Sequence, residues 1–371
     1  MAATQQQIYA GLDADLSWSE QQLPERERTR HVHRLHPYLG KYIPQLVEEL
    51  FRRHVPARGR VLDPFAGSGT TLVQALESGL HSVGVDIAAF NCLLMQVKTS
   101  EHKPFVLEHE LRDALTRFER GEGKASDKSA YLRAWFAPQA REDLLRFRSL
   151  IRDYEHADVL RVVLARAARS ARLTTHFDLD FPKVPQVGPY HCYKHKRECK
   201  PIEKADHFVR RYTLDTLARL KEFARVRTKR SVEVLHGDAG ELELPGAFDA
   251  VVTSPPYPGL IDYHEQHRYA YELLGLDDLR EREIGAAEQG TSKAAIASYV
   301  DGIVRVLVSC GEVMKPRGRF VIVVNDRREL YPEILERSGL MLEQRYQRHV
   351  NRRTGRRAGE YFEDVLVARL G

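Results

Sequence analysis

The residues best suited to chemistry are Ser254-Pro255-Pro256-Tyr257, a tetrapeptide that follows the apolar run at residues 248–253. The run predicts a buried strand that ends in a loop. A rigid double proline at such an end directs backbone carbonyls outward, and the aromatic ring behind it offers a flat face to a planar group. The pattern predicts a site that holds a nucleobase by its amino group.

A second pattern lies upstream, where residues 60–76 read as a strand, a turn and a helix. Gly67 and Gly69 in the turn let the backbone approach a ligand closely, and the helix N-terminus favours a polar or negative group. Leu72 replaces the third glycine of the dinucleotide fingerprint, so a pyrophosphate is disfavoured. Nineteen residues after Gly67, Asp86 ends a second predicted strand, where an acid commonly accepts hydrogen bonds from ribose hydroxyls. The turn and Asp86 predict a nucleoside-type cofactor.

Together, residues 63–71 and 254–257 resemble the cofactor and catalytic motifs of S-adenosyl-L-methionine (AdoMet)-dependent amino methyltransferases that act on DNA. Residues 36–46 are similar to the family's leading motif, beside the methionine end of the cofactor, and Asp238 matches the strand-end acid that meets its adenine. The resemblance assigns catalysis to the tetrapeptide. It assigns the cofactor to Lys41, Asp63, Phe65, Gly67, Gly69, Thr70, Thr71, Asp86 and Asp238.

The serine that opens the tetrapeptide resembles the cytosine-N4 branch of this family, because adenine-N6 enzymes more often have aspartate or asparagine there. The resemblance therefore implies methyl transfer to the N4 amine of cytosine in double-stranded DNA, at a defined sequence and after base flipping, with a restriction endonuclease as a partner. Adenine-N6 methylation is the nearest alternative. An RNA guanine-N2 methyltransferase and a non-catalytic nucleic-acid-binding protein also stay open. Methylation at ring carbon 5 needs a cysteine nucleophile, and no cysteine follows a proline here.

The predicted fold is α/β, a doubly wound, mostly parallel methyltransferase sheet with a C-terminal antiparallel hairpin and a largely helical insert. Residues 1–30 form an N-terminal arm whose order the sequence leaves undecided. Residues 31–100 and 231–371 form the methyltransferase domain, and residues 101–230 form the insert. Helices are expected at residues 44–53, from Pro138 onward and at 159–171, with a loop at 181–189.

The C-terminal third predicts a turn at residues 315–318, a strand at 320–324 and a hairpin that pairs 341–349 with 361–368. Four arginines in the connection at 351–357 suit phosphate contacts or a plain exposed turn. Residues 280–293, with two glycines, are expected to be a mobile loop near the tetrapeptide.

Charge is concentrated in the insert, where residues 101–230 hold 29 Lys and Arg against 19 Asp and Glu, although the whole chain has a formal net charge of only +5. Residues 183–230 hold 14 basic and 5 acidic residues, with interleaved tyrosines and phenylalanine. Such a mixture is typical of a surface that contacts a phosphate backbone, and a solvated helix face is the alternative. The insert is therefore a candidate DNA-recognition region.

Two thiols and two imidazoles fall within nine residues of the insert, at His191, Cys192, His195 and Cys199. Structural zinc normally takes a ligand pair from each of two separated segments, and no second Cys-x-x-Cys or His pair completes the set. The sequence therefore favours a basic loop without a metal over a zinc site.

The 371-residue chain is 43% hydrophobic, enough for one large domain with an insert. Four cysteines are too few for a disulfide scaffold in a chain of this length. No secretory signal, lipidation motif or apolar run of membrane-spanning length is expected. These observations predict a protein of the reduced cytoplasm with no membrane partner.

Overall fold

The computed structural model describes residues 13–19, 21–179, 181–350 and 361–371. They divide into two compact units. The first contains the described residues of 13–95, 226–262 and 281–371, and the second contains those of 96–225 and 263–280.

The first unit is built on a seven-stranded sheet with the order β5-β2-β1-β6-β7-β9-β8. Its strands are β1 (Arg60–Asp63), β2 (His81–Asp86), β5 (Val232–His236), β6 (Phe248–Thr253), β7 (Met314–Val324), β8 (Leu340–His349) and β9 (Phe362–Leu370). β5, β2, β1, β6 and β7 are parallel, whereas β9 pairs antiparallel with both β7 and β8. The expected mostly parallel sheet with a C-terminal antiparallel hairpin is confirmed. The connection between β8 and β9, with its arginines, lies outside the described residues.

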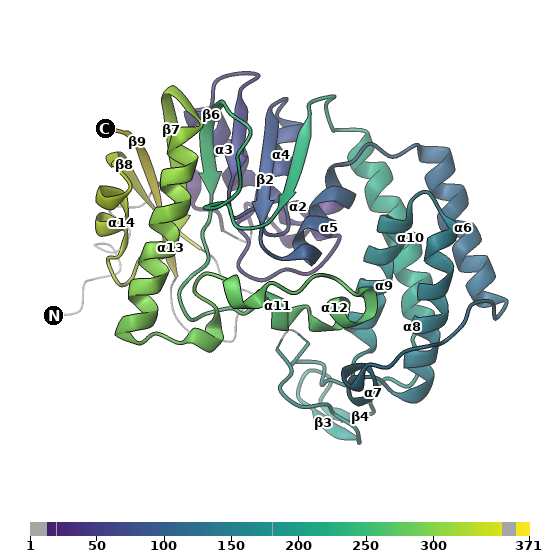
Figure 1. The fold of residues 1–371 in the computed structure, drawn as a ribbon. Helices are drawn as coiled ribbons and strands as arrows, with labels where there is room; N and C mark the ends of the chain where they lie inside the picture. Colours follow the sequence, from purple (N-terminus) through teal and green to yellow (C-terminus); the bar gives the residue numbers. More distant parts are fainter. Residues whose placement is uncertain (1–12, 20, 180, 351–360) are drawn as a thin grey trace. The chain divides into compact units, whose positions relative to one another are not determined.

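Helices cover both faces of this sheet (Figure 1). The α-helices of this unit are α2 (Glu25–Arg28), α3 (Pro44–His54), α4 (Thr70–Glu77), the first part of α5 (Ala89–Thr99), α13 (Lys293–Glu312) and α14 (Tyr331–Arg337). Along β7, Val321 and Val323 pack with α3 on one face, and Phe320 and Ile322 pack with α13 on the other. Buried side chains of this kind stabilise the fold by about 1.5–3 kcal/mol each.

α13 is the one helix among the described residues that is long and apolar enough to cross a membrane, with a mean hydropathy of 1.4. Core helices of soluble proteins share this length and composition, so the finding does not contradict the expectation of no membrane-spanning segment. In the structure its apolar side packs on the sheet, with Ile303, Leu307 and Cys310 fully buried in the core. The same apolar composition suits a helix that covers a buried parallel sheet.

The expected turn at Lys315–Gly318 is also corrected, because β7 continues through these residues. The pairing of β6 with β7 shifts register there, and Arg317 has a positive φ of 68°. Lys315 Nζ contacts the carboxylate of Asp249 at 2.8 and 2.9 Å. The proline and glycine that signal a turn are accommodated in a bulge within the strand.

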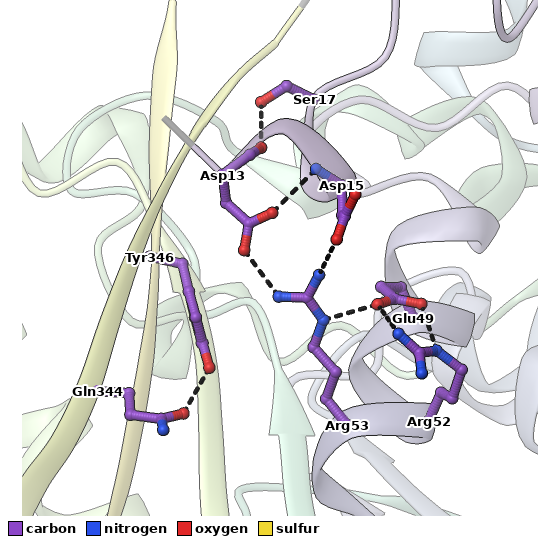
Figure 2. A network of polar contacts seen from close by, with 8 residues as sticks. All are labelled: Asp13, Asp15, Ser17, Glu49, Arg52, Arg53, Gln344 and Tyr346. Atoms are coloured by element: carbon purple, nitrogen blue, oxygen red, sulfur yellow. Dashed lines mark hydrogen bonds and ion pairs between the residues drawn. The ribbon is translucent and has the colours of Figure 1, made fainter. Parts of the chain in front are cut away.

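Residues of the arm before α3 are held against the sheet edge. Arg53 of α3 pairs with Asp13 at 2.7 Å and Asp15 at 3.3 Å, and with Glu49 of its own helix at 2.6 Å (Figure 2). Its guanidinium lies 5.5 Å from the centre of the Tyr346 ring on β8. The described part of the arm is therefore ordered by contacts that are distant in sequence.

The second unit is largely helical, as expected for the insert. It contains α6 (Pro104–Glu119), α7 (Ala130–Trp135), α8 (Pro138–Leu150), α9 (Ala157–Ala171), α10 (Asp206–Ala224), α11 (Tyr263–Gln266) and α12 (Arg268–Leu274), and the strands β3 (Tyr190–Cys192) and β4 (Arg197–Cys199). The expected helix start at Pro138 and the irregular loop at 181–189 are both present in the described residues. β3 and β4 form a separate antiparallel pair.

Candidate active site

The cofactor turn follows β1 at the carboxyl end of the sheet. Gly67 and Gly69 have positive φ values of 51° and 79°, and Gly69 caps the N-terminus of α4. The ring of Tyr38 lies over Gly67, because a Cβ there would be 3.0 Å from the tyrosine oxygen. Only glycine combines this close approach with a left-handed backbone. The leading segment at residues 36–46 therefore packs directly on the turn.

A glycine on β2 replaces the one that the fingerprint lacks. A Cβ on Gly84 would lie 2.7 Å from both terminal methyls of Leu72 and 3.0 Å from the Ala66 Cβ. Leu72 is fully buried. In the fingerprint the third glycine permits close packing of the helix on the strand. Here the glycine on the strand, Gly84, leaves the space that the Leu72 side chain occupies. Sequence reasoning missed Gly84, because the space belongs to a different element from the turn.

Asp86 at the end of β2 faces the turn. Its Oδ2 accepts a hydrogen bond from the Gly67 N–H at 2.8 Å, and its Oδ1 accepts from the Ala88 N–H and the Asn91 amide at 2.8 and 3.0 Å. Burial raises the pKa of the carboxyl, and these three hydrogen bonds oppose that shift. A carboxylate offers about four lone-pair sites, so one site on Oδ2 remains for a ribose hydroxyl. This acceptor position fits the ribose of a nucleoside cofactor.

Asp63 at the end of β1 joins three elements of the site. One carboxylate oxygen accepts from the Thr253 hydroxyl of β6 at 2.6 Å and from the Phe65 N–H at 3.2 Å. The other accepts from the hydroxyls of Thr71 and Tyr42. The side chain is 1% exposed, and burial raises its pKa to about 6. All four donors belong to the protein, so in this structure the carboxylate connects neighbouring elements.

The remaining residues expected to bind the cofactor lie around this turn. Thr70 begins α4 and is buried, and the Phe65 side chain packs against the core on the α13 face. Lys41 donates from Nζ to the His33 carbonyl at 2.6 Å, and burial lowers its pKa to about 8. Asp238 follows β5, where one oxygen pairs with Arg305 of α13 at 2.6 Å and the other accepts from the Gly240 N–H. Nothing in the local sequence indicates Arg305 as a partner.

The tetrapeptide begins where β6 ends. The Ser254 hydroxyl donates to the Val323 carbonyl of β7 at 2.9 Å, and the Pro256 carbonyl accepts from the Tyr299 hydroxyl at 3.0 Å. The Tyr257 hydroxyl donates to Glu363 of β9 at 3.2 Å. Burial, with Glu363 and Tyr361 nearby, holds the pKa of Tyr257 well above its usual value. The phenol is therefore neutral, and its ring is fixed by β9.

The two motifs meet at the switch point of the sheet. β1 and β6 are neighbours, the chain continues from β1 to β2 on one side and from β6 to β7 on the other, and ligands of doubly wound folds bind at such a point. Thr253, immediately before Ser254, bonds directly to Asp63 of the cofactor turn. The structure thus brings together residues that are 190 positions apart in the chain.

The segment at residues 280–293 packs against the loop after the tetrapeptide. The Gly259 N–H donates to the Gly285 carbonyl at 3.0 Å, and the Ala287 N–H donates to the Ile261 carbonyl at 3.2 Å. Glu283 is 5% exposed. These contacts describe a packed segment, where the sequence predicts a mobile loop.

Comparison with known proteins decides the family. The DNA methylase family of N6 and N4 enzymes matches residues 7–96. Type II methyltransferase M.MjaII of Methanocaldococcus jannaschii is 34% identical over 447 aligned positions, which cover 97% of this chain and 84% of that protein. The chain belongs to the N4/N6 family of AdoMet-dependent DNA methyltransferases. This membership confirms the resemblance and AdoMet as the cofactor, and it sets aside the RNA-modifying and non-catalytic alternatives.

Other relatives of this methyltransferase are more distant. Type II methyltransferase M.BsoBI of Geobacillus stearothermophilus is 26% identical and covers 71% of the chain and 57% of its own length. Among solved structures, TrmN from Thermus thermophilus has 12% identity and a TM-score of 0.36, covering 90% of this chain and 50% of that chain. The rRNA methyltransferase aviRa from Streptomyces viridochromogenes has 13% identity and a TM-score of 0.37, and the match covers 90% of this chain and 88% of that chain.

Proposed function

We propose that this methyltransferase modifies the N4 amine of cytosine in double-stranded DNA at a defined sequence, as the modification enzyme of a restriction system. The observation that supports an amino group as the target is the hydrogen bond from Ser254 to the Val323 carbonyl, and the choice of cytosine rests on the serine itself. Because the single hydroxyl proton is donated to the backbone, the oxygen presents only lone pairs to a ligand. It is therefore fixed as an acceptor, which is what an amino group requires.

The exocyclic amine of cytosine is a poor nucleophile, because its lone pair is delocalised into the ring. Hydrogen bonds from the amino group to Ser254 Oγ and to the Pro255 carbonyl would draw the nitrogen toward tetrahedral geometry. The neighbouring Pro256 carbonyl already accepts from Tyr299, which holds this part of the backbone in place. Positioning then supplies much of the rate, and no covalent enzyme intermediate is required.

The target cytosine must leave the duplex before its amine can reach this site. We assign the Tyr257 ring as the surface on which the extruded base stacks. Its hydroxyl contact with Glu363, which in turn lies 3.5 Å from Arg348, fixes the ring in one orientation before the base arrives. Stacking on a fixed ring costs less side-chain entropy than stacking on a mobile one.

The residues that would hold AdoMet are those around the glycine turn. Asp86 would accept from the ribose, Asp238 would meet the adenine, and Lys41 would pair with the methionine carboxylate while Gly67 and Gly69 allow close approach. When bound, AdoMet supplies an electrophilic methyl group. Asp63 takes a positioning role, because its oxygens already accept from protein donors and link the turn to β6.

We propose the second unit as the DNA-recognition region. Its β3–β4 hairpin exposes Tyr193, which is 77% accessible and directly precedes the basic residue Lys194, with Lys196 two positions further on. The Phe177 ring lies 6.2 Å from the Tyr193 ring. Exposed aromatic rings among lysines suit contact with bases and phosphates. This arrangement supports the expected role of the insert.

The product identifies the target base. The protein is incubated with deuterated-methyl AdoMet and, in parallel reactions, with PCR-amplified unmethylated DNA and with RNA, and the digested nucleosides are analysed by mass spectrometry. Labelled N4-methylcytosine is expected. Labelled N6-methyladenine would overturn the cytosine assignment and support the adenine alternative, which uses the same acceptor chemistry on a different amine. Label in RNA alone would overturn the DNA substrate.

A further inference from the structure

Four potential metal ligands converge in the second unit. They are His176, Cys192, His195 and Cys199, and one ligand atom from each lies within 4.8 Å of the others. Cys192, His195 and Cys199 belong to the β3–β4 hairpin and its turn, whereas His176 comes from the loop after α9. The hairpin's other imidazole, His191, faces Tyr193 instead, with ring centres 5.2 Å apart.

The distances match the edges of a zinc tetrahedron. His195 Nδ1 is 3.6 Å from Cys192 Sγ and 3.5 Å from Cys199 Sγ, and Cys192 Sγ is 3.4 Å from His176 Nδ1. With zinc–sulfur bonds of about 2.3 Å and zinc–nitrogen bonds of about 2.0–2.1 Å, tetrahedral angles place nitrogen and sulfur about 3.6 Å apart. The other pairs of ligand atoms lie within 4.8 Å, so small side-chain rotations would bring all four atoms around one ion.

The backbone of the hairpin already has the conformation that such a site needs. Cys192 pairs across the strands with Arg197, and Cys199 pairs with Tyr190, which places both thiols on the buried side. The turn between them closes with a hydrogen bond from the Lys196 N–H to the Cys192 carbonyl at 2.7 Å. The Tyr190 hydroxyl accepts from the His176 backbone N–H at 3.1 Å, which holds the upstream loop beside the thiols. The same hydroxyl lies 2.8 Å from His176 Nδ1, a contact that gives way when this nitrogen binds the ion.

Ordinary packing explains this cluster poorly. Two strands of three residues each bury too little surface to be stable alone. Cys192 is fully buried although it lies next to Tyr193, which is 77% exposed, and both thiols converge on a single nitrogen of His195. Thiol–imidazole hydrogen bonds cannot account for that convergence, since a ring nitrogen accepts along one direction. A metal ion accounts for both the burial and the convergence.

We propose that these four residues bind a structural Zn²⁺ ion that cross-links the loop after α9 to the β3–β4 hairpin. Two thiolates and two imidazoles complete a tetrahedral set and leave no open position, so the site is structural and not catalytic. The proposal departs from the expectation of a basic loop without a metal. His176 is the ligand that sequence reasoning missed, because it stands alone, 16 residues before Cys192.

The first test measures metal on the full-length protein purified without a metal-affinity step. Elemental analysis is expected to find about one zinc per chain, the stoichiometry of one closed four-ligand site. Replacing zinc with Co²⁺ should give the visible bands of tetrahedral cobalt and a thiolate charge-transfer band. Neither readout requires a variant or enzymatic activity. Absence of zinc, together with Co²⁺ spectra that lack thiolate bands, would overturn the proposal.

Variants then assign the ligands. Cys199→Ser should lower the zinc content at least tenfold, and His176→Ala should keep a thiolate band while losing the tetrahedral cobalt spectrum. His191→Ala is the matched control, since it removes an imidazole from the same hairpin outside the cluster, and it should keep a full zinc content. Equal loss of zinc in His191→Ala and His176→Ala, or full zinc content in Cys199→Ser, would refute this ligand set.

Discussion

Tyr257 offers a clean separation between an aromatic face and a hydroxyl group. Its ring is proposed to stack on the extruded cytosine, while its hydroxyl contacts Glu363 on β9. Tyr257→Phe keeps the face and loses the contact, whereas Tyr257→Ala loses both. The two substitutions therefore test different parts of the same side chain.

The expected magnitudes differ clearly. Base–aromatic stacking contributes about 1–3 kcal/mol by alanine substitution, so Tyr257→Ala should lower kcat/KM for DNA by about 5- to 150-fold. Loss of a hydrogen bond to a carboxylate costs about 1.5–3 kcal/mol, chiefly in folding stability. Tyr257→Phe should therefore lower the melting temperature but change kcat/KM by less than about threefold, since the stacking face remains.

The assay is single-turnover methyl transfer to DNA at saturating AdoMet, with AdoMet affinity measured by calorimetry as the control for folding. Both variants should bind AdoMet as the unsubstituted protein does. A mismatched target base, which is easier to extrude, should recover part of the activity of Tyr257→Ala. If Tyr257→Phe loses as much activity as Tyr257→Ala, the hydroxyl and not the ring carries the effect, and the stacking argument is refuted.

Three further predictions follow from single contacts. Burial lowers the pKa of Lys41 to about 8, so the side chain is cationic below that pH. The AdoMet affinity measured by calorimetry should therefore fall as the pH rises through 8, and the affinity of Lys41→Met should not change with pH. The same fall in affinity in Lys41→Met as in the unsubstituted protein would contradict this prediction. Thr253→Val removes a donor to Asp63 and should lower the free energy of unfolding by about 1–3 kcal/mol at pH 8. The loss should be smaller at pH 5, because the pKa of about 6 leaves the Asp63 carboxyl protonated there; denaturant titrations with equal losses at both pH values would exclude an ionised Asp63. Tyr193→Ala should weaken DNA binding several-fold in fluorescence anisotropy, whereas Tyr193→Phe should not. If Tyr193→Ala binds DNA as tightly as the unsubstituted protein, the hairpin is not part of the DNA interface.

The strands and turns of the cofactor and catalytic motifs could be predicted because their signals are local. Hydrophobic runs that end at Asp63, Asp86 and Thr253 each become a strand with those bounds. Their assembly at one edge of the sheet follows from parallel pairing. The family resemblance supplies the order in which the cofactor and catalytic motifs follow one another along the chain.

The rest depends on contacts between distant segments. Gly84 matters only because Leu72 of α4 packs on it, and Arg305 only because α13 brings it to Asp238. His176 carries no motif of its own and becomes a candidate ligand only after the loop folds back on the hairpin. Tertiary packing also changes the turn predicted at residues 315–318 into part of β7.

The most direct test of the catalytic claim concerns the acceptor at Ser254. Rates of N4-methylcytosine formation are compared for the unsubstituted protein, Ser254→Ala and Ser254→Thr, under single turnover with saturating AdoMet. Removal of one preorganised hydrogen-bonding group typically costs about 10²–10³ in rate. Ser254→Ala should show a loss of that size with unchanged AdoMet affinity, and Ser254→Thr, which keeps a hydroxyl, should remain within about tenfold of the unsubstituted enzyme. A Ser254→Ala enzyme as fast as the unsubstituted one would contradict the proposal that Ser254 Oγ accepts from the target amine.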